Sequence, residues 1–196
     1  MQVLVTEPAN LTLQDMTDDE FFEFCVHNQE NRIERTADGK VVIMSGTGGK
    51  TGNRNSRLTA QLNNWADSDG RGAAFDSNTM FRLPNTAMRA ADGSWVHISR
   101  LARLTPEQQE KFLPLCPDFV IELTSPSDRL PQVQEKMNEW MANGCQLGWI
   151  LDIKARQAHI YRASGVEVLE TPTRLLGEGP VEGFQLHLTR IWDPGW

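Results

Sequence analysis

The sequence contains few of the features that stabilise proteins outside the cell or in a membrane. Its three cysteines, Cys25, Cys116 and Cys145, are far apart and form no Cys-x-x-Cys pair. An odd, scattered set argues against a disulfide framework or a cysteine zinc site, so we expect reduced, partly buried thiols. No stretch approaches the roughly 18 apolar residues of a transmembrane helix. Residues 1–7 lack the basic start and long apolar core of a signal peptide. We therefore expect a cytoplasmic protein that does not bind membranes.

The sequence also lacks the excess of basic residues that is typical of general nucleic-acid-binding proteins. Its net charge at pH 7 is −7, whereas contacts to phosphate groups need Lys and Arg. The charge is uneven, because residues 48–103 contain eight basic and four acidic residues and carry +4, which leaves −11 for the rest. This segment is compatible with phosphate binding, although a solvated surface with scattered arginines is the simpler explanation of the charge alone.

Capping and turn signals divide the chain into alternating helices and strands. Thr17 and Glu20 form a capping-box pattern at the start of a helix that ends near residue 28. Asp38-Gly39 separates two short strands, at 32–36 and 40–44, and predicts a hairpin. Further helices are expected at 51–67, 105–110 and 128–143, a polar loop at 84–91, and strands at 73–76, 79–83, 94–98, 119–123, 147–152, 157–162, 166–169 and 184–188. This order predicts one α/β domain over residues 1–196, with a mixed sheet.

The apolar run Phe119-Val120-Ile121-Glu122-Leu123 contains one carboxylate. Its β-branched and aromatic residues predict a buried strand, which the following Ser-Pro-Ser-Asp sequence terminates. A carboxylate in such a strand is costly to bury unless a cation pairs with it. The partner could be a metal ion or an arginine, and an edge strand would instead expose Glu122 to solvent. These alternatives stay open from this segment alone.

Two other patterns resemble functional motifs without meeting their requirements. Gly46-Thr47-Gly48-Gly49-Lys50-Thr51 resembles a phosphate-binding loop, but Met44 stands where that motif requires glycine. Asp118 shares a strand face with Glu122, yet four residues of strand would separate their Cα atoms by about 13 Å. This distance is too long for both to hold one metal ion. We therefore expect Asp118 to cap the start of the strand.

Asp92, Glu122 and Lys136 are the best candidates for a hydrolytic site. Metal-assisted hydrolysis of a phosphodiester needs carboxylates that hold the cation, and a nearby basic group stabilises the developing charge. Asp92 and Glu122 each lie at or in a predicted strand, so neighbouring strands could bring them together. Lys136 lies at the edge of an apolar helical stripe, where its ammonium could reach a cleft. Asp92-Gly93 is equally a good turn, and a solvated surface position is the simpler explanation of Lys136 from spacing alone.

Five blocks of the sequence, taken in order, are similar to one known family. The blocks are Glu34-Arg35-Thr36-Ala37-Asp38-Gly39, Thr47-Gly48-Gly49-Lys50-Thr51-Gly52-Asn53-Arg54-Asn55, Asp92-Gly93-Ser94-Trp95-Val96, residues 117–128, and Glu135-Lys136-Met137 leading to Asn143-Gly144, Trp149 and Asp152. Together they resemble a family of putative restriction endonucleases that is abundant in cyanobacteria and belongs to the PD-(D/E)xK nuclease superfamily. The resemblance covers residues 17–192. It implies a restriction-endonuclease-like mixed sheet flanked by helices, with Mg²⁺ or Mn²⁺ at the active site.

The resemblance also assigns roles to single residues. By position it implies that Asp92 and Glu122 bind the metal ion and that Glu34 is an auxiliary ligand or orients water. In the common superfamily pattern a lysine follows the glutamate by two residues, where this chain has Thr124. The chain resembles the branch in which the lysine lies on the next helix, and Lys136 takes that place.

The departures from the family pattern, Gly46 and Ala91 in place of proline, remove no catalytic side chain. We therefore expect a divalent-metal-dependent DNA endonuclease that acts as a homodimer. Lys50, Arg54 and Arg57 are the candidates for contacts to the DNA backbone. The alternative is a non-catalytic, dimeric binding protein on a nuclease fold. Metal titration separates the two, because only the nuclease should bind Mg²⁺ or Mn²⁺ at its carboxylates.

Overall fold

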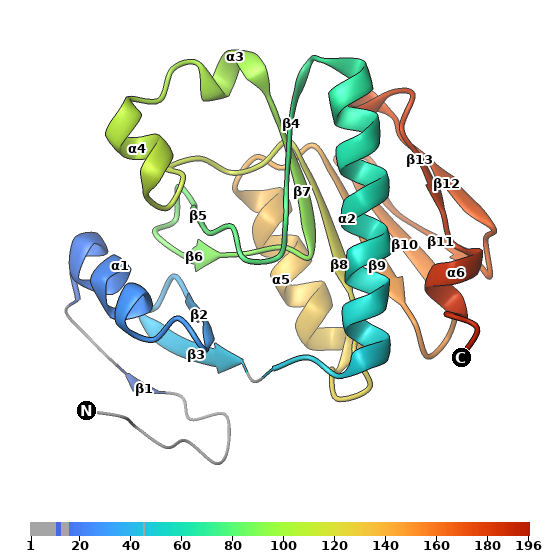
Figure 1. The fold of residues 1–196 in the computed structure, drawn as a ribbon, viewed down its shortest axis with the longest axis horizontal. Coiled ribbons are helices and arrows are strands. Elements are labelled where there is room, and N and C mark those ends of the chain that lie inside the picture. Colours follow the sequence, from blue (N-terminus) through green and yellow to red (C-terminus); the bar gives the residue numbers. More distant parts are fainter. Residues whose placement is uncertain (1–10, 13–15, 45) are drawn as a thin grey trace.

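Two β-sheets organise the chain, and each belongs to one of two lobes (Figure 1). The computed structural model describes residues 11–12, 16–44 and 46–196. The N-terminal lobe lies to one side of a larger lobe, in which long helices cover a six-stranded sheet (Figure 1). The predicted mixed α/β architecture with an N-terminal helix and hairpin is confirmed.

The N-terminal lobe begins with the helix that the capping box predicts. The Thr17 hydroxyl accepts a hydrogen bond from the Glu20 amide, and the Glu20 carboxylate accepts one from the Thr17 amide. Gly39, with a φ of +83°, closes the predicted hairpin. The elements of this lobe are α1 (Asp18–His27), β1 (Leu11–Thr12), β2 (Arg32–Arg35), β3 (Lys40–Met44), β5 (Phe81–Arg82) and β6 (Met88–Arg89), in the sheet order β1-β3-β2-β6-β5.

Strand β6 lies inside the segment 84–91, for which the sequence predicts a polar loop. That prediction is wrong for its two residues, because Met88 pairs with Arg35 of β2 and with Arg82 of β5. The Met88 side chain is buried in the core of the N-terminal lobe. A strand of two residues is too short to show any periodicity in the sequence. Its place in the sheet carries Arg89 to the border between the lobes.

The larger lobe is built on a mixed sheet whose two central strands are parallel. Its strands are β4 (Gly72–Phe75), β7 (Gly93–His97), β8 (Phe119–Leu123), β9 (Leu147–Asp152), β10 (Gln157–Arg162) and β11 (Gly165–Glu170), in the order β11-β10-β9-β8-β7-β4. Strands β8 and β9 pair in parallel, and all other neighbours pair antiparallel. Helix α5 (Leu130–Ala142) connects β8 to β9, as a parallel pair requires.

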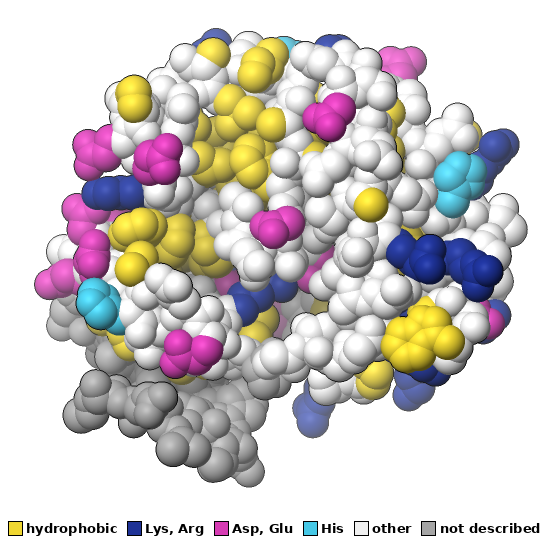
Figure 2. Space-filling view, viewed as in Figure 1, with side chains coloured by type: hydrophobic (Ala, Val, Ile, Leu, Met, Phe, Trp, Pro, Cys, Tyr) yellow, Lys and Arg dark blue, Asp and Glu magenta, His cyan; other side chains and the backbone are white. Residues whose placement is uncertain are grey.

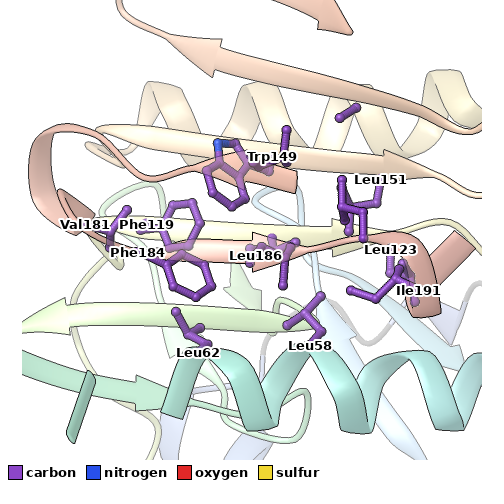
Figure 3. Packing of buried hydrophobic residues seen from close by; sticks show 14 of the residues in the cluster. Leu58, Leu62, Phe119, Leu123, Trp149, Leu151, Val181, Phe184, Leu186 and Ile191 are labelled. Carbon is purple, nitrogen blue, oxygen red and sulfur yellow. The ribbon is translucent and has the colours of Figure 1, made fainter. Parts of the chain in front are cut away.

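Helices cover both faces of this sheet, so its central strands are buried on both sides. Figure 3 shows one face, where Leu58 and Leu62 of helix α2 (Gly49–Asp69) pack toward Phe119, Trp149 and other apolar residues. On the opposite face the apolar side of α5 forms a second core. All residues of β8 and β9 are buried, Glu122 included. Strand β8 lies in the middle of the sheet, so the edge-strand alternative for Glu122 is wrong.

Gly93, the first residue of β7, lies where α2 approaches the sheet closely. A Cβ atom at this position would lie 2.5 Å from Cδ2 of Leu58, which is far inside van der Waals contact. The glycine after Asp92 therefore serves helix packing, and Asp92 itself immediately precedes β7. The turn explanation of the Asp92-Gly93 pair is not needed.

Shorter elements complete the larger lobe. The sequence predicts a strand at 184–188, and the structure has a two-stranded hairpin there. The hairpin consists of β12 (Arg174–Leu176) and β13 (Gln185–His187). The other short elements are α3 (Ile98–Leu101), α4 (Pro106–Glu110) and α6 (Thr189–Trp192), with a 3-10 turn at Gly179–Val181. No helix among the described residues is both long and apolar enough to cross a membrane.

The three cysteines are free thiols. Cys116 and Cys145 are buried, and Cys25 is half-buried. Burial raises the pKa of Cys116 to about 12 and that of Cys25 to about 11. Because the thiolate is the reactive form, these thiols are poor nucleophiles. They act as small apolar side chains, in agreement with the sequence prediction.

Candidate active site

The four residues predicted to be catalytic lie together at the border between the two lobes. Glu34 comes from β2, Asp92 precedes β7, Glu122 lies in β8 and Lys136 lies in α5. Lys136 Nζ is 2.9 Å from Glu34 Oε1 and 3.1 Å from Glu122 Oε1. Figure 2 shows Lys or Arg side chains in a recess near the centre of the face, with acidic side chains beside them. We refer to these four residues and Arg32 as the charged cluster.

Glu122 points away from the apolar core that surrounds its strand neighbours. Residues alternate between the faces of a strand, so Phe119, Ile121 and Leu123 pack toward α2 while Glu122 faces α5. Trp140 of α5 donates a hydrogen bond from Nε1 to Glu122 Oε1 over 2.9 Å. One turn of helix separates Trp140 from Lys136, and both therefore reach the same carboxylate.

Ionisation of the Glu122 carboxyl group in this buried position costs free energy. Burial raises its pKa above the ordinary value of 4.5, Lys136 acts in the opposite direction, and the negative charge of Asp92 raises it again. The net direction is upward, although an ammonium group lies in contact with the carboxylate. A buried carboxylate with a raised pKa next to another carboxylate is typical of functional sites.

Asp92 is held by one backbone amide and two side chains. Its Oδ2 accepts a hydrogen bond of 2.8 Å from the Leu123 amide, at the end of β8. Its Oδ1 lies 3.3 Å from Nη1 of Arg32 and 3.4 Å from Nδ2 of Asn55 on α2. The backbone contact fixes the carboxylate beside the strand that carries Glu122, so that both carboxylates lie at the same end of neighbouring strands.

Glu34 is an ionised carboxylate in the middle of three cations. Burial alone would raise its pKa, but Lys136, Arg32 and Arg89 together outweigh burial and hold the pKa at about 2. Arg89 Nη1 lies 3.1 Å from Glu34 Oε2, and the Ala90 amide donates to Oε1 over 3.3 Å. The side chain of Glu34 is only 3% exposed. Its geometry suits the positioning of Lys136.

Sequence analysis missed four members of this site: Arg32, Asn55, Arg89 and Trp140. Arg32 stands two residues before Glu34 in a predicted strand, which places both on one face, and this was a detectable signal. Trp140 lies four residues after Lys136 on a predicted helix, which was a second one. Asn55 lay in one of the family blocks, but nothing in the sequence linked it to Asp92, and Arg89 gave no signal at all. The places of both depend on how α2 and β6 pack in the fold.

The three predicted DNA-binding residues lie on α2, outside the charged cluster. Lys50 and Arg57 are exposed, and Arg57 Nε donates to Asn53 over 3.0 Å. Arg54 is only 8% exposed, and its Nε donates to the Ile191 carbonyl over 2.8 Å. Arg54 therefore links α2 to α6 in this structure.

The donor atoms of the charged cluster suit a hard divalent cation. Mg²⁺ and Mn²⁺ prefer carboxylate oxygens, and a cation near Asp92 and Glu122 would offset the electrostatic cost of burying both. Among the described residues, however, no group of three or more His, Cys, Asp or Glu side chains is arranged to hold a metal ion. Arg32 and Lys136 lie among the carboxylates instead. The donors fit the metal, and these two cations would compete with it.

Comparisons with known proteins agree with the resemblance seen in the sequence. The chain matches a crystal structure of a putative nuclease belonging to DUF820 from Anabaena variabilis, with a TM-score of 0.71. The match has 21% sequence identity and covers 91% of this chain and 98% of the other. At this identity it shows a shared fold. No curated protein matches the chain.

A family model gives the broader assignment. Residues 18–189 match the model of the Uma2 family, which is described as putative restriction endonuclease. The match includes every residue of the charged cluster and covers most of the 196 residues. The chain therefore belongs to the Uma2 family of putative restriction endonucleases.

Proposed function

We propose that this protein is a divalent-metal-dependent endonuclease that hydrolyses phosphodiester bonds of DNA. The observation that carries the proposal is the pairing of Asp92 and Glu122, two buried carboxylates at the ends of neighbouring strands with Lys136 in contact. Membership of the Uma2 family supports the same reaction class. Asp92 and Glu122 would hold Mg²⁺ or Mn²⁺, which when bound activates water and neutralises developing negative charge.

The residues of the chain prepare this site in separate ways. The Leu123 amide holds one oxygen of Asp92 and leaves the other directed toward the cluster. Glu34 holds the Lys136 ammonium in place, and its charge also qualifies it as an auxiliary metal ligand or a group that orients water. Lys136 would orient the attacking water or stabilise the charge on the phosphate.

DNA binding is proposed for Lys50 and Arg57, which are the exposed basic residues of the three predicted on α2. Arg54 supports this face by holding α6 against α2. In Figure 2, basic side chains gather over the C-terminal part of the chain beside α2. Because the whole protein carries −7, contacts to phosphate must come from such local groups.

A homodimer remains part of the proposal, since two active sites are needed to cut both strands of a duplex at once. The two terminal tryptophans differ as interface candidates. Trp192 is buried and donates from Nε1 to the Pro172 carbonyl over 2.7 Å, so it belongs to the core. Trp196 is 68% exposed and is available for an interface.

Cleavage of supercoiled plasmid DNA with Mg²⁺ or Mn²⁺ tests the proposal. We expect wild type to nick or linearise the plasmid, and Asp92→Asn and Glu122→Gln to lower the rate about 1,000-fold or more through loss of the metal site. Asp152→Asn is the matched control, because Asp152 is a buried carboxylate at the end of the adjacent strand that caps the Lys154 and Ala155 amides. It should retain activity.

Two outcomes would contradict the proposal. Undiminished cleavage by folded Glu122→Gln would show that the activity does not come from this site. Failure of wild type to bind Mn²⁺ in calorimetry, together with no cleavage, would favour a non-catalytic binding protein on this fold. Lys136→Met should retain metal binding and lose cleavage, which separates the role of the ammonium from that of the carboxylates.

A further inference from the structure

Arg32 has no role in the proposed function, yet its guanidinium contacts two other members of the charged cluster, Glu34 and Asp92. Its Nη1 lies 3.3 Å from Asp92 Oδ1, and its Nη2 lies 3.4 Å from Glu34 Oε1 and 2.5 Å from the Ala90 carbonyl oxygen. Burial would lower the pKa of Arg32, but Glu34, Asp92 and Glu122 together raise it. The guanidinium is therefore the counter-ion of the three carboxylates.

The two oxygens of Asp92 have different partners. Its Oδ2 is used by the Leu123 amide, which is part of the backbone and cannot move independently. The remaining oxygen, Oδ1, is the one that Arg32 contacts. A divalent cation bound at Oδ1 would lie beside the Arg32 guanidinium, and the repulsion between the two positive groups would oppose metal binding.

Arg32 is easier to displace than Lys136, the other cation of the cluster. Lys136 makes contacts of 2.9 Å to Glu34 and 2.7 Å to the Ala90 carbonyl. Arg32 contacts the same carbonyl at 2.5 Å, but its carboxylate contacts, at 3.3 and 3.4 Å, are longer than the Lys136–Glu34 contact. Its buried Nε has no hydrogen-bond partner among the described residues. Arg32 is also the more exposed, at 23% against 17%. If Arg32 leaves, Lys136 still satisfies the Ala90 carbonyl.

We propose that Arg32 is a built-in occupant of the metal site, and that a divalent cation binds to Asp92 only when the Arg32 guanidinium moves away. This inference rests on the proposed function, because it assumes that Asp92 and Glu122 hold the metal. Arg32 neutralises the carboxylates of the metal-free protein and thereby lowers metal affinity. The intrinsic affinity of the carboxylates is accordingly higher than the affinity that wild type shows.

Isothermal titration of Mn²⁺ into wild type, Arg32→Gln and Arg89→Gln tests this competition. We expect Arg32→Gln to bind Mn²⁺ at least tenfold more tightly than wild type, a gain of about 1.4 kcal/mol. Arg89→Gln is the matched control. It removes the same charge from Glu34, but the contacts of Arg89 are to Glu34 and Glu139. Its gain in Mn²⁺ affinity should be at least threefold smaller than that of Arg32→Gln.

Two further variants locate the binding and guard against misfolding. Adding Asp92→Asn to Arg32→Gln should abolish the gain, because the contested oxygen is then part of an amide. Arg32→Lys keeps the charge but cannot reach Asp92 and Ala90 with two donors in a planar fork. It should therefore bind Mn²⁺ with an intermediate affinity, and it carries the test if Arg32→Gln does not fold.

The outcomes separate this inference from the proposed function. If wild type binds Mn²⁺ and Arg32→Gln binds it equally or more weakly, Arg32 is not a competitor, while the nuclease proposal stands. An equal gain in Arg32→Gln and Arg89→Gln would also overturn the inference, since it would reflect net charge alone. If neither wild type nor Arg32→Gln binds Mn²⁺, both the metal site and its occupant are refuted.

Discussion

Strand β8 has a buried carboxylate at each end, and the two ends differ in what surrounds the charge. Asp118 precedes the strand and Glu122 lies near its far end, and both are at most 5% exposed. Asp118 accepts three hydrogen bonds of 2.8 to 2.9 Å, from the His97 amide, Arg100 and Gln146. Every donor at this end suits an ionised carboxylate. The start of the strand is therefore a satisfied structural site.

At the other end of β8, two carboxylates, Glu122 and Asp92, lie near each other. Glu122 shares its surroundings with Asp92, the net effect raises its pKa, and its contacts to Lys136 are 3.1 and 3.4 Å. Burial alone does not distinguish the two carboxylates. The distinction lies in the neighbours, because Glu122 shares its surroundings with a second carboxylate, Asp92, whereas Asp118 is held by three hydrogen-bond donors. A buried carboxylate with a raised pKa beside another carboxylate is typical of a functional site.

Removing Asp118 should produce the largest loss of stability. Asp118→Ala leaves the His97 amide, Arg100 and Gln146 without their shared acceptor. We expect the free energy of unfolding to fall by about 3 kcal/mol, as measured by urea denaturation. Mn²⁺ affinity should remain unchanged in the folded variant. A loss below about 1 kcal/mol would mean that this end of the strand is not the structural one.

Neutralising Glu122 should raise the free energy of unfolding, whereas removing Asp118 lowers it. Glu122→Gln removes a charge that is buried next to Asp92 and keeps an oxygen that can accept from Trp140. We expect the free energy of unfolding to rise by about 1 kcal/mol, as is common when functional polar groups are replaced, while Mn²⁺ binding is lost. Thermal melts under identical conditions would check this. If the variant were as unstable as Asp118→Ala, the contrast between the two ends would disappear.

The smallest effect should appear in the pH dependence of stability. The pKa of Glu122 is higher in the folded than in the unfolded protein, so its contribution to stability is greatest below pH 4.5 and declines as pH rises through the folded pKa. Glu34 behaves oppositely, because its folded pKa is about 2, and its contribution is lost as pH falls from 4.5 toward 2.

Urea unfolding across this pH range would resolve the two contributions. Glu122→Gln should remove the decline in the free energy of unfolding above pH 4.5, a change of about 1 kcal/mol or less. Glu34→Gln should reduce the loss of stability below pH 4.5. Identical pH profiles for wild type and Glu122→Gln would contradict the raised pKa. The same measurements on Asp152→Asn would show how much of the profile comes from the rest of the protein.

Local signals in the sequence predicted most of the fold. Asp38-Gly39 located the hairpin, Thr17 and Glu20 located α1, and the apolar runs gave the bounds of β9 and β10 as the structure has them. Each of these signals lies within a few residues of the element that it predicts. Element ends were less accurate, since α2 begins at Gly49, two residues before the predicted start.

The sequence named four candidate residues that the structure brings together, but it did not predict their contacts. Lys136 was identified from its place on a helix and from the family resemblance, and the structure brings it to Glu34 and Glu122. Arg54 shows the limit of such reasoning, because its partner carbonyl is 137 residues away in the chain and depends on how α6 packs. Long-range pairings of this kind have no local signature.

The missing side chain at Gly93 has a consequence for how this active site tolerates mutation. A single methyl group there would lie 2.5 Å from Cδ2 of Leu58, so either the Leu58 side chain must change rotamer in the buried core or α2 and β7 must separate. Separation of α2 from β7 would carry Asn55 away from Asp92. The packing of one small, neutral residue against α2 is thereby linked to the support of a carboxylate that it does not touch.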